Sequence, residues 1–278
     1  MKYSTKLTTI LLSAVLSASF VSQSAFAFAT DNSKRKTYTL TEKVGKKVSK
    51  VYDLYSADKI DEALVLALTI KPKKAYDKAY MAKFLGGMYA SQSGKGLEAI
   101  KYTKIAVDAD ILSTTEHGSS IRTLADLQMQ EKQYAKAVQN YKSWIEFTGK
   151  EDANVYIRMG AAYMALKQYS NVTAPADKAI ALQASEPKET PFRLKLGAYY
   201  EDKKPKKAIG VLETMVELFP NEPRNWPQLG QFYMLDEQYD RALETMHIAY
   251  INGFLTKKSH ILVLAQLYTN NDIPYRSA

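Results

Sequence analysis

The sequence predicts an all-α fold, a right-handed α-solenoid of helical hairpins. Along its 278 residues, a small or β-branched residue returns in steps of 34 to 38 positions, which is the length of a two-helix repeat. Within the units, apolar residues recur every three or four positions, the helical period, and no alternating strand pattern lasts beyond a few residues. The recurring positions are Ala63, Ala99, Ala137, Val172, Ala208, Ala242 and Ala278.

The repeat is clearest from Trp226 onward. Residues 226–233 read W-x2-L-G-x2-Y, and Ala242, Met246 and Ala249 follow at the spacing A-x3-F-x2-A, with Met in the Phe position. The pattern resembles the tetratricopeptide repeat (TPR). We therefore expect the glycine to let the second helix pack closely, the aromatic residue to fill the gap between the two helices, and Ala249 to seat the next hairpin.

The same spacing predicts six hairpins and the start of a seventh. The first has the weakest pattern, and in the others a small residue of the first helix precedes the recurring position of the second. These small residues are Gly86 and Gly87, Ala125, Gly160, Gly197, Gly230 and Ala265. We also expect four tyrosines to pack between helices, namely Tyr163, Tyr200, Tyr233 and Tyr268.

The domain organisation follows from these units. The repeats occupy residues 41–278, and a short linker over residues 28–40 precedes them. Because the sequence stops at Ala278, inside what should be the second helix of the seventh unit, we expect the solenoid to be cut off within its last repeat.

The N-terminus has the pattern of a secretion signal over residues 1–27. Lys2 and Lys6 precede an apolar run from Leu7 to Val21, and a small-x-small pattern predicts cleavage near Ala27 or Ala29. The alternative is a membrane anchor, but the run is shorter than the roughly 20 residues that a bilayer requires. We expect an exported, periplasmic protein with no stable membrane insertion after cleavage.

The composition excludes several kinds of metal and catalytic site. The chain has no cysteine and three histidines, so thiolate metal sites, iron–sulfur clusters and thiol nucleophiles are excluded. The glycine-rich stretch from Gly87 to Gly96 has the wrong spacing for a phosphate loop, and Gly96 stands where a Ser or Thr should bind magnesium. We expect no catalytic, metal or cofactor site and no enzymatic activity. The formal charge of +9 comes partly from lysine runs in turns, which do not indicate nucleic-acid binding.

A partner-binding surface is predicted on the concave face, which the first helices of such a solenoid line. Polar residues there that escape the packing pattern are candidates, and the alternative is that they form hydrogen bonds between repeats. Arg158 and Asn154 lie one turn apart on one face, where they suit a carboxylate or backbone amide of a bound peptide. The candidates are Arg122, Asp126, Asn154, Arg158, Gln228 and Gln231.

The sequence also resembles one group of exported TPR proteins. The segments LQMQEKQY (127–134), WIEFTGKE (144–151), PADKAIAL (175–182) and GFLTKK (253–258) are similar to the TPR proteins of marine gammaproteobacteria that are associated with the TonB system. The resemblance implies a non-catalytic periplasmic scaffold, an accessory to TonB-ExbB-ExbD energised uptake of iron–siderophores, with protein or peptide partners. The alternative function is a periplasmic assembly or chaperone-like factor for envelope proteins or polysaccharide export.

Overall fold

A computed structural model describes residues 35–270, which form thirteen α-helices and one short 3-10 helix, without strands in that range. The predicted signal peptide, its cleavage site, most of the linker and Ala278 lie outside the described residues. The helices are α1 Glu42–Ser56, α2 Ile60–Thr69, α3 Ala75–Ala90, α4 Gly96–Asp108, α5 Thr114–Gln130, α6 Tyr134–Thr148, α7 Ala153–Ala165, η2 Tyr169–Asn171, α8 Thr173–Leu182, α9 Glu189–Glu201, α10 Pro205–Leu218, α11 Asn225–Leu235, α12 Tyr239–Ile251 and α13 Lys258–Asn270.

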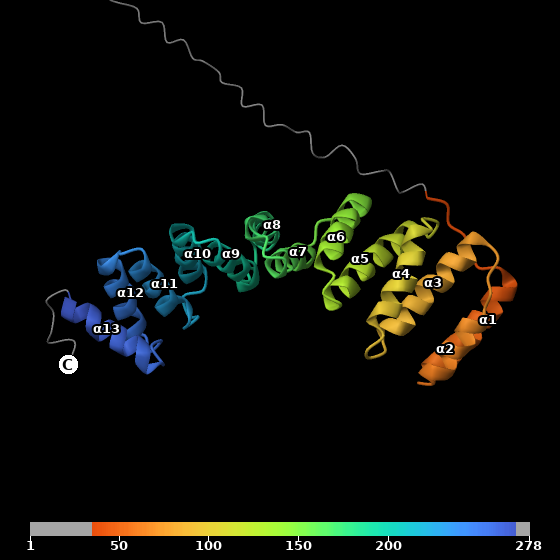
Figure 1. Ribbon diagram of the computed structural model, residues 1–278, viewed down its shortest axis with the longest axis horizontal. Helices are drawn as coiled ribbons and strands as arrows, with labels where there is room; N and C mark the ends of the chain where they lie inside the picture. The colour runs from red at the N-terminus through yellow and green to blue at the C-terminus, as the bar shows by residue number, and fades with distance from the viewer. Residues whose placement is uncertain (1–34, 271–278) are drawn as a thin grey trace, which may run out of the picture.

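Consecutive helices pair as antiparallel hairpins, and each hairpin packs against the next. The six pairs run from α1–α2 to α11–α12, and α13 is the first helix of a seventh unit. Figure 1 shows the hairpins stacked in chain order into an elongated solenoid, with α1 and α2 at one end and α13 at the other. The predicted all-α solenoid is confirmed.

The recurring small residue is fully buried in every described hairpin. In all six described units its side chain is 0% exposed, so a larger residue would have no room there. The six residues are Ala63, Ala99, Ala137, Val172, Ala208 and Ala242. The core is accordingly divided into several apolar clusters along the solenoid, as expected where each repeat contacts mainly its neighbours.

The turns inside the hairpins repeat one backbone geometry. A residue with positive φ follows the first helix, and the next backbone N–H closes a six-residue ring, as in Lys204 to the Tyr199 carbonyl at 2.8 Å and Gln238 to the Tyr233 carbonyl at 2.8 Å. This closure satisfies carbonyls that the helix end would leave without partners. The left-handed residues are Asp58, Lys132, Lys167, Lys203 and Glu237, with Gly94 in the longer turn of the second unit.

In the fifth hairpin one packing prediction is wrong, that of Tyr200. Tyr200 is 59% exposed and does not lie between its helices, whereas Leu196 is buried and Tyr199 packs partly against the core. The physical reason is a one-residue shift in helical phase, about 100° around the axis. Leu196 takes the inward position that the motif gave to Gly197, and Tyr200 turns out onto the surface beside Phe232, with ring centroids 5.9 Å apart.

The segment before α1 contacts the second and third hairpins. Thr41 donates from its backbone N and its hydroxyl to the Asp77 carboxylate, at 3.0 and 2.7 Å. Arg35 pairs with Asp110 at 2.8 Å and donates to the Leu112 carbonyl at 3.2 Å. Residues 35–41 therefore lie fixed against the solenoid. Within residues 35–270, no helix has the length and apolar character needed to cross a bilayer.

Two adjacent glycines of α3 give a stability prediction. A Cβ at Gly86 would lie 2.4 Å from the Thr103 hydroxyl and 3.0 Å from its backbone N, whereas a Cβ at Gly87 would meet nothing within 4 Å. Gly86→Ala should lower the free energy of unfolding by about 1–3 kcal/mol through overpacking. Gly87→Ala should raise it by about 0.5–1 kcal/mol through helix propensity. Urea unfolding followed by circular dichroism measures both, and equal losses in the two variants would contradict the prediction.

Candidate functional site

Clefts run between consecutive first helices, on the surface that we call the first-helix face (the exposed side of α1, α3, α5, α7, α9, α11 and α13). Two of them join at Gln231 and Leu235 near the C-terminal end of the described chain. One has a volume of about 420 Å³ and lies between α9 and α11, and the other, of about 600 Å³, lies between α11 and α13. We call this joined feature the amide cleft.

The lining of the amide cleft combines apolar and amide side chains. Tyr200 and Leu235 are 59% and 65% exposed, which makes them accessible apolar contacts. Amide groups pair with both the N–H and the C=O of a peptide backbone. The amide side chains in the lining are Gln228, Gln231, Gln266 and Asn270, and Arg193 is the one charged residue among those that line it.

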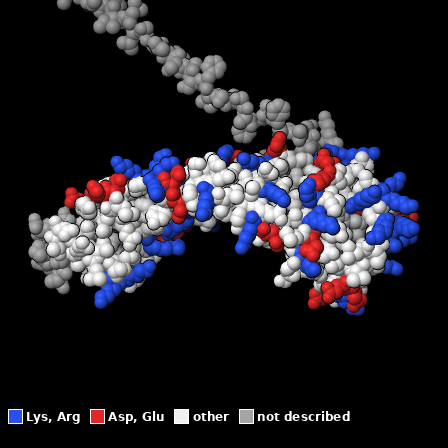
Figure 2. All heavy atoms as spheres, in the orientation of Figure 1, with Lys and Arg blue, Asp and Glu red and all other residues white. Residues whose placement is uncertain are grey.

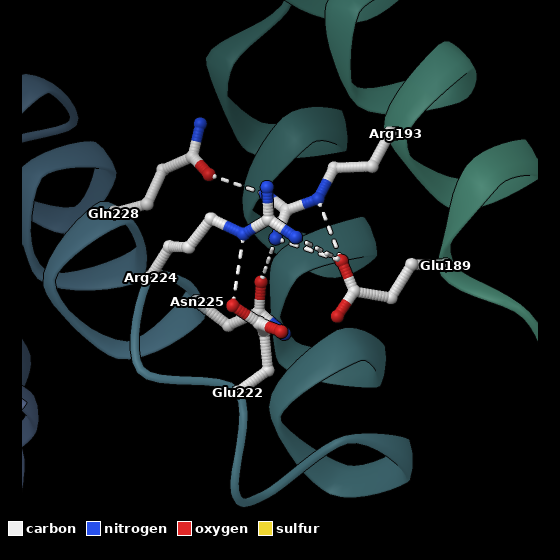
Figure 3. Close-up of polar contacts among 6 residues, drawn as sticks. All are labelled: Glu189, Arg193, Glu222, Arg224, Asn225 and Gln228. Carbon is white, nitrogen blue, oxygen red and sulfur yellow. Dashed lines mark hydrogen bonds and ion pairs between the residues drawn. The ribbon is translucent and has the colours of Figure 1, made fainter.

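A polar network closes one wall of the amide cleft (Figure 3). The Arg193 guanidinium donates to Glu189 Oε2 at 3.0 Å, to Gln228 Oε1 at 2.9 Å and to Asn225 Oδ1. Arg224 donates to Glu222 at 2.8 Å and to the same Glu189 oxygen at 3.4 Å. The network thereby ties α9 to the start of α11, and its two cations are balanced by two carboxylates.

Asn225 is the fully buried member of this network, with 0% exposure. Because a guanidinium only donates, the Asn225 carbonyl oxygen must face Arg193. Its Nδ2 then points away and has no hydrogen-bond partner. Arg193 is therefore a structural connector whose remaining surface lines the cleft.

Among the residues predicted from sequence, Arg122 and Asp126 lie in contacts between repeats. Arg122 pairs with Asp152 at 2.7 Å and lies over the Trp144 ring. Asp126 accepts from the Tyr141 hydroxyl at 2.5 Å and pairs with Arg158 at 3.4 Å. The Arg122–Asp152 and Asp126–Arg158 pairs each join the third hairpin to the fourth, whereas the bond between Tyr141 and Asp126 lies inside the third.

These contacts shift two pKa values. Burial raises the pKa of Asp152, but the Arg122 guanidinium and backbone N–H groups of α7 outweigh it, so the net pKa is below the ordinary value. Burial and the Asp126 carboxylate together raise the pKa of Tyr141, whose hydroxyl stays protonated. Both shifts are those of structural pairs that keep their charge states near neutral pH.

The other predicted residues differ in their exposure and in whether their side chains already have a partner within the protein. Asn154 and Gln231 are exposed, and Gln231 lines both parts of the amide cleft. Arg158 is also exposed although it pairs with Asp126, and Gln228 is held by Arg193. The structure brings Gln228 and Gln231 together in one cleft, while the other four lie on α5 and α7. Their role in binding a partner stays a prediction.

Sequence reasoning missed several lining residues of the amide cleft. Arg193, Tyr200 and Leu235 were not candidates. For Arg193 and Tyr200 the reason is the one-residue phase shift in α9, which hid the side of that helix that faces outward, whereas Leu235 is the last residue of α11 and an apolar residue that the search for polar candidates passed over. The available signal was the spacing within the repeat, since Gly197 precedes Ala208 by 11 positions whereas Gly230 precedes Ala242 by 12. Among the described residues, no group of three or more His, Asp or Glu side chains is placed to hold a metal ion.

Comparison with known proteins shows the fold. Neither a protein-family model nor a curated protein matches the sequence. Among solved structures, the C-terminal part of a TPR protein from Cytophaga hutchinsonii aligns with a TM-score of 0.57 at 16% identity, covering 83% of this chain and 91% of that one. A TPR protein from Parabacteroides merdae gives 0.51 at 14% identity, covering 85% and 90%. The chain thus has the fold of TPR proteins.

A third similar structure is described as having a peptide site. YrrB, described as a TPR protein with an unusual peptide-binding site, aligns with a TM-score of 0.50 at 14% identity, covering 66% of this chain and 89% of that one. At such identities the likeness concerns the arrangement of helices, and the residues of the amide cleft are this chain's own.

The polar network gives a second stability prediction. Arg193→Met should lower the free energy of unfolding by about 1–3 kcal/mol, because it leaves the buried Asn225 amide without a donor. Adding Asn225→Leu should restore part of that loss, since the unpaired group is then gone. Urea unfolding of the two variants measures this, and an equal or larger loss in the double variant would contradict it.

The Arg122–Asp152 pair gives a pH prediction. Asp152→Asn keeps an oxygen that can cap α7 but removes the charge, and should cost about 0.5–1 kcal/mol near neutral pH for so exposed a pair. Because the folded pKa of Asp152 lies below its ordinary 3.8, the stabilisation is complete above that value and is lost as the pH falls through the folded pKa. The difference between wild type and variant, measured by unfolding at several pH values, should disappear in acid. A constant difference would contradict this account.

Proposed function

We propose that the chain is a protein-interaction scaffold whose amide cleft binds an extended peptide segment of its partner. The observation that carries the proposal is the lining of the amide cleft, which combines uncharged amides with the exposed apolar side chains of Tyr200 and Leu235. Amide side chains match the donors and acceptors of an extended backbone, and Leu235 and Tyr200 contact its side chains. The TPR fold supports this function, because such solenoids offer a long surface for binding.

The physiological role that we propose is accessory to TonB-ExbB-ExbD energised uptake of iron–siderophores in the periplasm. Its support is the sequence resemblance described above, together with the secretion-signal pattern of residues 1–27. The periplasmic location has its own test. Mass spectrometry of the protein purified from its host should find an N-terminus just after Ala27 or Ala29. An intact Met1 would contradict export by cleavage.

Site-specific photo-crosslinking tests the amide cleft and the partner together. A photoreactive residue at Gln231 lies inside the amide cleft, and one at Gly210 is the matched control, because Gly210 is exposed on the second helix α10 with nothing near its Cβ. In iron-starved cells of the native host, we expect a crosslink from position 231 and none from 210. Mass spectrometry then identifies the partner.

The identity of the crosslinked protein decides between the functions. TonB, ExbD or a TonB-dependent receptor would support the uptake role. A wide set of unrelated envelope proteins would instead favour the assembly-factor function. Equal crosslinking from both positions, or none from 231, would contradict the amide cleft as the binding surface.

A further inference from the structure

A second cleft, at the opposite end of the solenoid, has aromatic side chains at four of its seven lining positions. It lies between the first helices α1 and α3, has a volume of about 300 Å³, and we call it the aromatic cleft. Its lining residues are Tyr52, Tyr55, Tyr80, Lys83, Phe84, Gly87 and Met88. No packing motif of the repeat requires four aromatic rings on this face.

The rings of the aromatic cleft belong to a longer aromatic series. Tyr52 stacks on Phe84 with centroids 5.0 Å apart, and a hydrogen bond joins Tyr52 to Tyr80. The ring centroid of Tyr80 lies 6.2 Å from that of Tyr76, which in turn lies 5.8 Å from the ring centroid of Tyr38. Tyr52 is 48% exposed, whereas Tyr55, Tyr80 and Phe84 are half-buried and pack against the core of the first two hairpins. The cleft is therefore accessible at Tyr52 and has its base on the core.

Gly87 keeps the middle of the aromatic cleft open. Its neighbour Gly86 is required by the close approach of Thr103, but a Cβ at Gly87 would meet no atom within 4 Å. A glycine inside a helix costs about 0.5–1 kcal/mol relative to alanine. No contact inside the described protein accounts for that cost, whereas an occupant lying against the helix would.

The polar groups of the aromatic cleft define the chemistry of the occupant. The lining offers the hydroxyls of Tyr52, Tyr55 and Tyr80 and the Lys83 ammonium. Because one of the Tyr52 and Tyr80 hydroxyls donates to the other, two hydroxyl protons remain available to an occupant. None of the lining residues carries a carboxylate or amide. Lys83 is already neutralised by Glu116 at 2.8 Å and lies over the Tyr80 ring. Glu116 is itself held by Lys83 and Ser113, which outweigh its burial and lower its pKa. The cleft therefore suits an uncharged occupant that presents hydrogen-bond acceptors and apolar rings.

Proline meets these requirements better than other residues. It has no backbone N–H that would need an acceptor, and its carbonyl remains free to accept from a tyrosine hydroxyl. A polyproline II segment exposes such carbonyls without internal hydrogen bonds and stacks its rings in aromatic grooves. Sugars also stack on aromatic rings, but their many hydroxyls need both acceptors and donors, and the cleft lacks the carboxylates and amides that supply them.

We propose that the aromatic cleft binds a proline-rich, polyproline II segment of a protein partner. The inference rests on the proposed scaffold function and adds the chemistry of a second contact, separated from the amide cleft by the third and fourth hairpins.

The test uses the full chain with fluorescein-labelled decaproline, measured by fluorescence anisotropy, with a Gly-Ser decamer as the control peptide. A Cβ at Gly87 meets no atom within 4 Å, so the side chain of Gly87→Leu should enter the open cleft and weaken decaproline binding about tenfold or more. Gly210→Leu is the matched control, since it also adds a side chain to an open helical glycine but on a second helix. Its affinity should match wild type within about twofold. Because the lining has no unpaired charge, raising the salt from about 0.05 to about 0.5 M should change the affinity little.

Each other outcome overturns the proposal. Absence of decaproline binding, or equal binding by the Gly-Ser decamer, would exclude polyproline recognition. Binding that Gly87→Leu does not weaken would place the site elsewhere. Calorimetric binding of maltohexaose without decaproline binding would assign the cleft to a glycan. The effect of Gly87→Leu reports on the aromatic cleft, which the first two repeats form. It is therefore independent of the crosslink at position 231, which tests the amide cleft.

Discussion

The rest of the structure depends on the close contact between the two helices of each hairpin. The recurring small residue of the second helix is fully buried. At Gly86 and Gly230 of the first helices even one methyl group would collide with the second helix, at Thr103 and Met246, which follow the recurring Ala99 and Ala242 by four positions. This contact fixes how far apart the helices lie and which side of each faces inward. The turn geometry and the outward side of the first helices follow from it, because a helix has only one phase once its packed residues are set.

Polar side chains of the first-helix face connect the hairpins to one another. Arg122 with Asp152, Asp126 with Arg158, and Arg193 with Asn225 each join successive repeats. A solenoid lacks a central core, so these partly buried contacts help to set the angle between neighbours. These contacts lie on the same face as the clefts. A polar residue on that face therefore either joins two repeats or remains available to bind a partner.

The two clefts differ in chemistry because they belong to different repeats. The amide cleft presents amides and exposed aliphatic groups, whereas the aromatic cleft presents rings and hydroxyl donors. Near the aromatic cleft the surface is also basic, with Lys43, Lys46, Lys47 and Lys50 exposed along α1, and Figure 2 shows Lys and Arg gathered at that end. One partner that contacts both clefts would gain affinity from the linkage of two modest sites.

The sequence by itself determined the fold. The repeat spacing located all six described hairpins, and the recurring small residue was buried in each, because close helix packing needs small residues at a fixed interval. It also put Gln228 and Gln231 on the outer side of α11. Tertiary structure alone decided the remainder. A one-residue phase shift moved Tyr200 outward, and pairing across repeats engaged Arg122, Asp126 and Gln228. Tyr52 and Phe84 come together only when α1 packs beside α3. These features depend on contacts between residues about 30 positions apart in sequence, which a local period does not encode.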